Sequence, residues 1–187
     1  MQQFNIAIAA IILLSFYFVE KERDEYATFF IVVGTLVKLY GIVGLVFFFF
    51  SKHKVRYLVS LVIWSVVLFC LPMLISSPEY QIQQYQEWFT CLAGKNSENL
   101  LANSQNISLM GMITKITYGL SGGKIIHDAS WIILPAMVLM AIGYFRVGQW
   151  KNPMFRIQIL AAVMMFVVLF STGSESSGYI TPFVGIC

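Results

Sequence analysis

Charged side chains are scarce in this chain of 187 residues, where Lys, Arg, Asp and Glu together make up 11%. Soluble domains carry about 25% charged residues, because they need a polar exterior. Here 58% of the residues are hydrophobic, and the mean hydropathy is +0.76. The composition therefore excludes a soluble globular domain and predicts an integral membrane protein.

Motifs of several common function classes are also missing. The chain has no glycine loop for phosphates or dinucleotides and no basic patch interleaved with aromatic residues for nucleic acid. Its three cysteines and two histidines do not have the spacing of a zinc site: they are Cys70, Cys91, Cys187, His53 and His127. We therefore expect no metal, no cofactor and no nucleic-acid partner.

Long apolar runs are what the chain has instead. They are continuous rather than alternating, and lipid cannot satisfy a free backbone, so the runs predict helices. They lie at residues 4–19, 27–50, 55–75, 130–145, 155–170 and 178–187. The sequence therefore predicts an all-α, polytopic transmembrane helical bundle, with about five or six membrane segments in one membrane domain over residues 1–187.

The two ends of the chain are abrupt. Residues 178–187 have the character of the first half of a membrane helix, whereas a full span needs about 20 residues. An apolar segment also follows Met1 within a few residues. We therefore expect a truncated piece of a larger polytopic protein.

Two basic loops indicate the orientation. Residues 51–56 and 146–156 each carry three Lys or Arg residues and no acid, which is typical of the cytoplasmic side. Residues 76–129 then form an external loop with short amphipathic helices. Tyr80, Tyr85 and Trp88 in this loop suit a helix lying in the membrane interface, although such residues also simply mark an interface.

The run at residues 27–50 has two interpretations. It is either a plain span, or a re-entrant hairpin bent near Gly34 and Gly41 that returns to the side it left. A lone Lys38 at the bilayer centre costs about 3 kcal/mol on insertion scales, and a bend facing an external polar cavity removes much of that cost. We favour the hairpin, which places Asn5 outside and Lys21 and Arg23 inside.

Two features could carry chemistry. Lys38 is an intramembrane cation that suits an anionic headgroup or a polar cavity, with snorkelling or a pair with a glutamate as the alternatives. Residues 171–177 set hydroxyls, including Ser174, around the carboxylate of Glu175, a composition that suits a polyhydroxylated substrate. The alternative for this hinge is a solvated turn.

Four features in this order resemble glycosyltransferase family 87, whose members have the GT-C membrane fold. Gln3-Phe4-Asn5 is similar to a Gln-x-Asn motif of the family. The stretch from Gly34 to Lys38 is similar to the family's glycine and lysine before a proline. The third and fourth are Asn106-Ile107-Ser108-Leu109 in the external loop and Phe170-Ser171 before the hinge. The resemblance covers nearly all of the chain but only the C-terminal part of a family member.

The resemblance implies a mannosyl- or hexosyltransferase of a bacterial plasma membrane and cell envelope. Its donor would be a polyprenyl-phosphate-linked sugar, its acceptor a glycan or glycolipid, and its reaction would occur on the outer face without a metal. Lys38 would stabilise the phosphate, while Gln3, Asn5, Ser174 and Glu175 would bind the substrate. The catalytic carboxylate would lie upstream of Met1, so we expect this chain alone to be inactive.

Two departures and two other function classes stand beside this resemblance. Tyr40-Gly41 replaces the family's usual Tyr-Pro, and Ser176-Ser177 stand where some members have histidine, so no histidine role is carried over.

A fragment of a secondary transporter or lipid-sugar flippase would also show broken helices and a cation at mid-membrane. A structural membrane subunit would leave Lys38 and Glu175 without a role.

Overall fold

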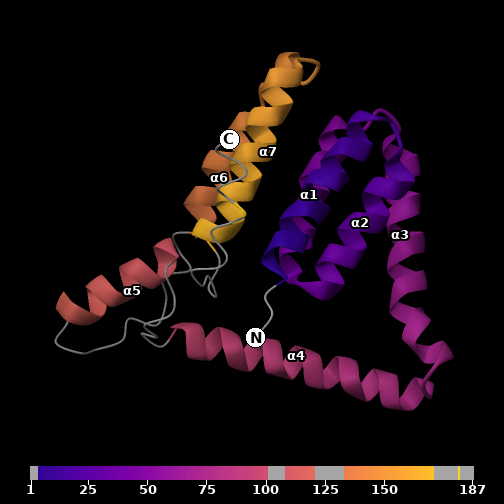
Figure 1. Ribbon diagram of the computed structural model, residues 1–187. Helices are drawn as coiled ribbons and strands as arrows, with labels where there is room; N and C mark the ends of the chain where they lie inside the picture. Colours follow the sequence, from indigo (N-terminus) through magenta and orange to yellow (C-terminus); the bar gives the residue numbers. More distant parts are fainter. Residues whose placement is uncertain (1–3, 101–107, 121–132, 171–180, 182–187) are drawn as a thin grey trace. The chain divides into compact units, whose positions relative to one another are not determined.

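The computed structural model of the chain describes residues 4–100, 108–120 and 133–170, together with Thr181. Every regular element in these ranges is a helix (Figure 1), which confirms the predicted all-α class. One of these helices, Lys54–Leu74, is long and apolar enough to cross a membrane by length and composition. The predicted number of five or six membrane segments stays a prediction.

The chain divides into two compact units, Met1–Trp88 and Phe89–Cys187. The first unit contains α1 (Asn5–Glu20), α2 (Asp24–Val37), η1 (Leu39–Phe50), α3 (Lys54–Cys70) and η2 (Leu71–Leu74), where η marks a 3₁₀ helix. The central helix is α2, which packs against α1, η1 and α3. Membership of both units in one membrane domain stays a prediction.

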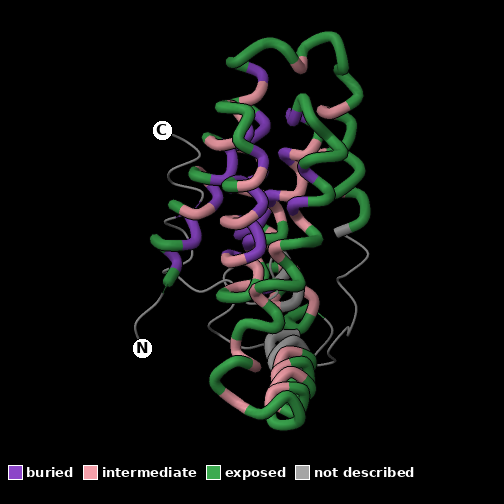
Figure 2. Tube along the Cα trace, turned by 90° about the vertical axis from the view of Figure 1, so that its right-hand side faces the viewer, coloured by how far each residue is buried: buried purple, intermediate pink, exposed green. Residues whose placement is uncertain are grey.

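The core of the first unit follows from helical spacing. Ile8, Ile12 and Phe16 lie on one side of α1 and are buried, as expected for residues four apart. The ring of Phe16 meets that of Phe47 edge to face, with 5.3 Å between their centroids. Buried positions face the interior of the bundle and exposed ones its outside (Figure 2).

The buried residues of η1 are spaced by three: Gly41, Gly44, Phe47 and Phe50. This spacing matches the three residues per turn of a 3₁₀ helix. The two glycines lie near the bend and the two phenylalanines near the other end, so η1 approaches α2 most closely where the chain reverses. A Cβ atom added at Gly44 would lie 2.6 Å from Cγ1 of Ile31.

The chain reverses at Lys38, as the hairpin interpretation predicts. Lys38 has extended backbone angles, φ −153° and ψ 126°, which end α2 and start η1. A Cβ atom at Gly41 would lie 2.3 Å from both the carbonyl carbon of Gly34 and the amide nitrogen of Thr35. The bend therefore needs glycine at this position because two backbones touch there, and no proline is required.

Loops at the opposite end of the first unit support the same topology. Lys52, between η1 and α3, pairs with Glu22, between α1 and α2. Only the hairpin interpretation places the acidic loop of residues 20–25 beside the basic loop of residues 51–56. Glu22 itself has a positive φ of 58°, which lets the chain turn tightly after α1.

The second unit contains most of the remaining helices. The helix α4 (Pro78–Leu100) begins in the first unit, and α5 (Leu109–Leu120), α6 (Ile133–Tyr144), η4 (Val147–Gln149) and α7 (Pro153–Leu169) follow. A Cβ atom at Gly143 of α6 would meet Ile159 of α7 at 3.5 Å, so these two helices are in contact. Asn152 caps α7 by accepting a hydrogen bond from the amide of Met154, at 3.0 Å.

Two of these helices, α4 and α5, lie in the predicted external loop of residues 76–129. They have 23 and 12 residues, respectively, so α4 is longer than the short helices that the sequence predicted. Their position outside the membrane stays a prediction.

Candidate functional site

Two of the predicted site residues meet at the tip of the hairpin. The Nζ atom of Lys38 donates a hydrogen bond of 2.7 Å to Oδ1 of Asn5, although the residues lie 33 positions apart in the chain. Asn5 is buried, with 5% of its surface exposed, and Lys38 is partly buried. The structure therefore turns two separate candidates into one site.

The topology explains why this pair forms. Asn5 is the first residue of α1, and Lys38 follows the last residue of α2. Because α1 and α2 are joined by a tight turn and pack side by side, the start of α1 lies beside the end of α2 (Figure 1). A buried amide must find a hydrogen-bond partner, and the lysine provides one for its oxygen.

The hairpin tip fixes the position of the ammonium group of Lys38. The neutral amide of Asn5 accepts its hydrogen bond. The same nitrogen lies 4.8 Å from the centre of the Tyr40 ring, within the range of a cation–π contact. The N-terminus of α1 begins at Asn5 and adds a partial positive charge.

The other predicted site residues lie outside the described residues. This applies to Gln3, Ser174 and Glu175, whose assignment to substrate binding stays a prediction. In the described ranges, no group of three or more His, Cys, Asp and Glu residues is arranged to hold a metal ion.

Sequence reasoning missed a polar network at the opposite end of the first unit. Asp24 is buried, with 1% of its surface exposed, and its Oδ2 accepts a hydrogen bond of 3.0 Å from Oγ of Ser51. Its Oδ1 atom has no hydrogen-bond partner among the described residues. Burial raises the pKa of the Asp24 carboxyl, and the hydrogen bond from Ser51 and the charges of His53 and Arg56 offset only part of this rise.

Two ion pairs join the same two loops as the hydrogen bond between Ser51 and Asp24. Lys52 lies 2.5 Å from Glu22, and Arg56 lies 2.5 Å from Glu25. The hydrogen bond from Lys52 lowers the pKa of Glu22. The opposite charge of residues 20–25 and 51–56 was the sequence signal for this network, and it became informative only once the hairpin had joined the two loops.

Buried hydroxyls connect this network to the bundle. Oγ1 of Thr28 lies 2.7 Å from Oγ of Ser60, which joins α2 to α3. Thr28 also donates to the carbonyl oxygen of Asp24, at 2.9 Å. Together with the bond from Ser51 to Asp24, these bonds connect the loops of residues 20–25 and 51–56 to α2 and α3.

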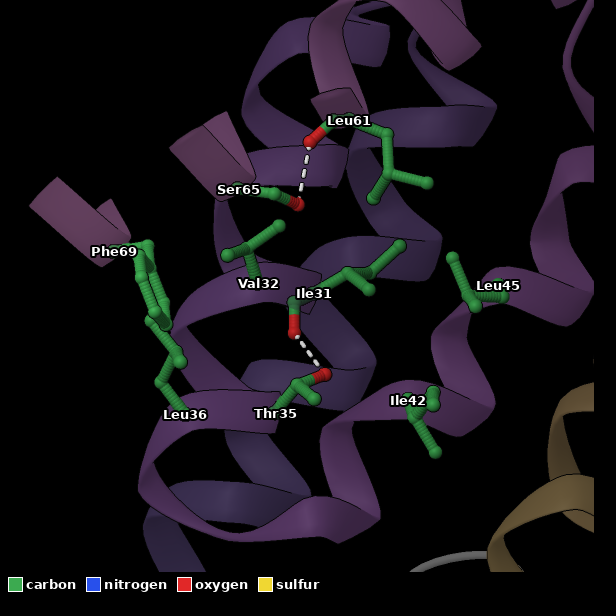
Figure 3. A pocket seen from close by; sticks show the side chains of 9 residues that line it. All are labelled: Ile31, Val32, Thr35, Leu36, Ile42, Leu45, Leu61, Ser65 and Phe69. Carbon is green, nitrogen blue, oxygen red and sulfur yellow. Dashed lines mark hydrogen bonds between the residues drawn. The ribbon is translucent and has the colours of Figure 1, made fainter. Parts of the chain in front are cut away.

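An apolar groove runs between α2, η1 and α3, with a volume of about 270 Å³. Figure 3 shows that its two hydroxyls point back to their own helices: Thr35 donates to the carbonyl of Ile31, at 2.7 Å, and Ser65 to that of Leu61, at 2.8 Å. The groove therefore offers hydrocarbon surface. Its lining residues are Ile31, Val32, Thr35, Leu36, Ile42, Leu45, Leu61, Ser65 and Phe69.

Comparison with known proteins gives one match. The family model of glycosyltransferase family 87 matches residues 1–172. The matched range includes Asn5 and Lys38 and ends before Ser174 and Glu175. No curated protein matches the chain, and no solved structure matches it.

Proposed function

The chain belongs to glycosyltransferase family 87, and from this premise we propose that it serves the transfer of a hexosyl group, of the mannosyl type, from a polyprenyl-phosphate-linked sugar. Membership of the family implies a sugar donor and an acceptor, and one apolar helix and the family agree with a membrane-associated protein. The polyprenyl phosphate, the glycan or glycolipid acceptor and the outer face of a bacterial plasma membrane belong to the proposal.

The observation that carries this proposal is the hydrogen bond between Lys38 and Asn5 at the hairpin tip. In such a transfer the bond between the anomeric carbon and the phosphate oxygen breaks, and a bond to the acceptor oxygen forms. The acceptor proton passes to a general base. The bonding electrons remain on the lipid phosphate, whose growing negative charge a fixed ammonium group stabilises.

The position of this pair within the bundle supports a site on the outer face of the membrane. Asn5 and Lys38 lie at the end opposite the loop of residues 51–56, which carries three basic residues. Basic loops mark the cytoplasmic side of membrane proteins. A multi-pass arrangement with this loop inside would therefore direct Lys38 toward the outer leaflet.

Binding of a polyprenyl monophosphate to the chain in lipid nanodiscs tests this proposal. Lys38→Gln should weaken binding about tenfold to a hundredfold, since hydrogen bonds to charged groups contribute about 1.5–3 kcal/mol. Lys38→Arg should retain part of the affinity, because it keeps the charge.

Lys52→Gln is the matched control, because it removes a lysine from the opposite end of the same unit and should leave affinity within about twofold. Equal affinity of Lys38→Gln and the unsubstituted chain would overturn the assignment of Lys38 to the lipid phosphate.

The hairpin is also compatible with one other function class, a lipid-sugar flippase. A broken membrane segment with a cation is also found in transporters, so a lipid-sugar flippase would bind the same phosphate. Proteoliposomes loaded with labelled donor separate the two functions: a transferase moves the label to an acceptor, whereas a flippase moves intact donor between leaflets. The family match favours the transferase over a flippase or a structural subunit.

A further inference from the structure

The helix α4 has two chemically different sides. Ile82, Tyr85, Phe89 and Leu92 follow one another at intervals of three, four and three residues. This spacing places them on one side of an α-helix, and we call this set the apolar stripe. The opposite side carries polar residues, among them Gln83 and Glu87.

The polar side of α4 is organised for water. Nε2 of Gln83 donates to Oε1 of Glu87, at 2.9 Å, and Nε2 of Gln84 donates to Oε2 of the same carboxylate, at 3.3 Å. Both contacts are exposed. A carboxylate with exposed amide neighbours keeps its favourable hydration only in an aqueous environment.

Tyr85 fixes how α4 is turned relative to α3. Its hydroxyl donates to the carbonyl oxygen of Phe69, at 2.8 Å. The two rings are stacked, with 4.1 Å between their centroids and 16° between their planes. Because Tyr85 belongs to the apolar stripe, the stripe begins where the apolar surface of α3 ends.

The surface of α3 that leads to this contact is also apolar and open. Only 11% of the most hydrophobic part of Lys54–Leu74 is buried. Val62 is 62% exposed, and Leu74 at the end of the segment is 83% exposed. In the stripe itself Ile82 is 50% exposed. One apolar surface thus continues from a candidate membrane helix onto α4.

We propose that α4 lies in the interface of the outer leaflet, with the apolar stripe in the acyl region and Gln83 and Glu87 in water. The partner is a lipid bilayer, since the surface that continues onto the stripe belongs to the helix with the length and composition to cross one. Amphipathic helices bind membranes in this way through buried apolar area. The inference rests on the membrane placement proposed above.

This placement has a consequence for the hairpin tip. Within the first unit, α3 ends at the same end of the bundle as Lys38, because α2 and α3 both run from the loop end toward it (Figure 1). A helix that lies in the interface directly after α3 therefore places Lys38 at a depth close to the membrane surface. At this depth a lysine can contact the headgroup of a lipid.

Labelling of single cysteines by N-ethylmaleimide in liposomes of phosphatidylethanolamine and phosphatidylglycerol tests this inference. The background is the full chain with Cys70, Cys91 and Cys187 replaced by serine. Thiols react as thiolates and need water, so Ile82→Cys should label about tenfold more slowly than the adjacent Gln83→Cys. Phe89→Cys and Thr90→Cys form a second matched pair with the same expected difference.

Val62→Cys separates this inference from the membrane placement on which it rests. If Val62→Cys labels as fast as Gln83→Cys, the membrane placement of α3 fails. If Val62→Cys is protected while Ile82→Cys and Gln83→Cys label equally fast, α3 stays in the membrane and the inference for α4 is overturned. Equal protection on both sides of α4 would also overturn it, because protein would then cover the helix. All variants should label equally after unfolding in dodecyl sulfate.

Discussion

The two ends of the first unit hold their cations in different ways. At the hairpin tip, Lys38 meets the neutral amide of Asn5 and the ring of Tyr40. At the loop end, Lys52 and Arg56 each meet a carboxylate. The pairs at the loop end join two loops of opposite charge, whereas the bond at the tip joins the start of α1 to the end of α2 and includes two of the predicted substrate-binding residues. The tip is therefore the end of the unit to test for ligand binding.

Substitution of Gly41 should break the tip most severely. In Gly41→Ala the new Cβ atom would lie 2.3 Å from two backbone atoms, which cannot move aside as a flexible side chain can. We expect a loss of about 3 kcal/mol in unfolding free energy, the upper range for overpacking. The melting temperature in detergent micelles measures this loss.

Gly94→Ala is the matched control for Gly41→Ala. Nothing lies within 4 Å of a Cβ atom at Gly94 in α4, and alanine is a better helix former than glycine by about 1 kcal/mol. Equal melting temperatures for the two variants would mean that the close approach of Gly34 and Gly41 does not hold the hairpin.

Asn5→Asp should weaken ligand binding at the tip. The new carboxylate would lie within hydrogen-bond reach of Lys38, so the fold should persist, while its negative charge should lower the affinity for a polyprenyl monophosphate about tenfold. Binding and melting measured on the same nanodisc samples separate these two effects. Asn152→Asp adds the same charge at the exposed cap of α7, where aspartate is an equally good cap, and should leave binding unchanged.

Unchanged affinity in Asn5→Asp would show that the charge of Lys38 is not what the lipid meets. Loss of folding in that variant would point to a structural role for the amide of Asn5. Asn5→Ala then decides between the outcomes, because it removes the partner of Lys38 without adding a charge.

The buried carboxyl of Asp24 predicts a pH dependence at the loop end. Its raised pKa means that the folded chain holds the proton more tightly than the unfolded chain, whose pKa is about 3.9. The stability from this group is present below that value and is lost as pH rises through the raised folded pKa. The amide side chain in the variant Asp24→Asn does not titrate. The melting temperature of this variant minus that of the unsubstituted chain should therefore increase as the pH rises above about 4.

Glu22→Gln should show the opposite pH dependence of stability to Asp24→Asn. The Lys52 hydrogen bond lowers the pKa of Glu22, so its contribution is present above the unfolded pKa and disappears as pH falls. A melting temperature of Asp24→Asn that runs parallel to that of the unsubstituted chain at all pH values would contradict the burial of an ionisable Asp24.

The smallest effect is expected for the exposed pair of Glu25 and Arg56. Both side chains are about half exposed, and such pairs contribute about 0.2–1 kcal/mol. Glu25→Gln should lower the melting temperature slightly at low salt and have no effect near 1 M salt, where screening is strong. A large loss that persists at high salt would assign the pair a greater structural role than its exposure indicates.

The sequence predicted both residues of the candidate site but not the contact between them. Lys38 stood out because a charge in an apolar run is costly, and Asn5 because of its family motif. The distance between them, 2.7 Å, could not be read from the sequence, since it depends on how α1 packs beside α2. Asp24 was missed because an acid in a charged loop gives no local sign that its carboxyl will be buried.

The amino-acid sequence by itself determined the all-α class, the family, the approximate helices and the candidate cation. The class, the helices and the candidate cation follow from local composition, because a continuous apolar run in lipid must satisfy its own backbone and so forms a helix. The family follows from short motifs and their order. Only the tertiary structure decided between the hairpin and the plain span, and only it showed that Asn5 meets Lys38 and that the carboxyl of Asp24 is buried. The physical reason is that hydrophobic burial has no direction and does not by itself choose which helices pack together. That choice depends on specific contacts, such as the close approach at Gly41 and the hydroxyl pair of Thr28 and Ser60.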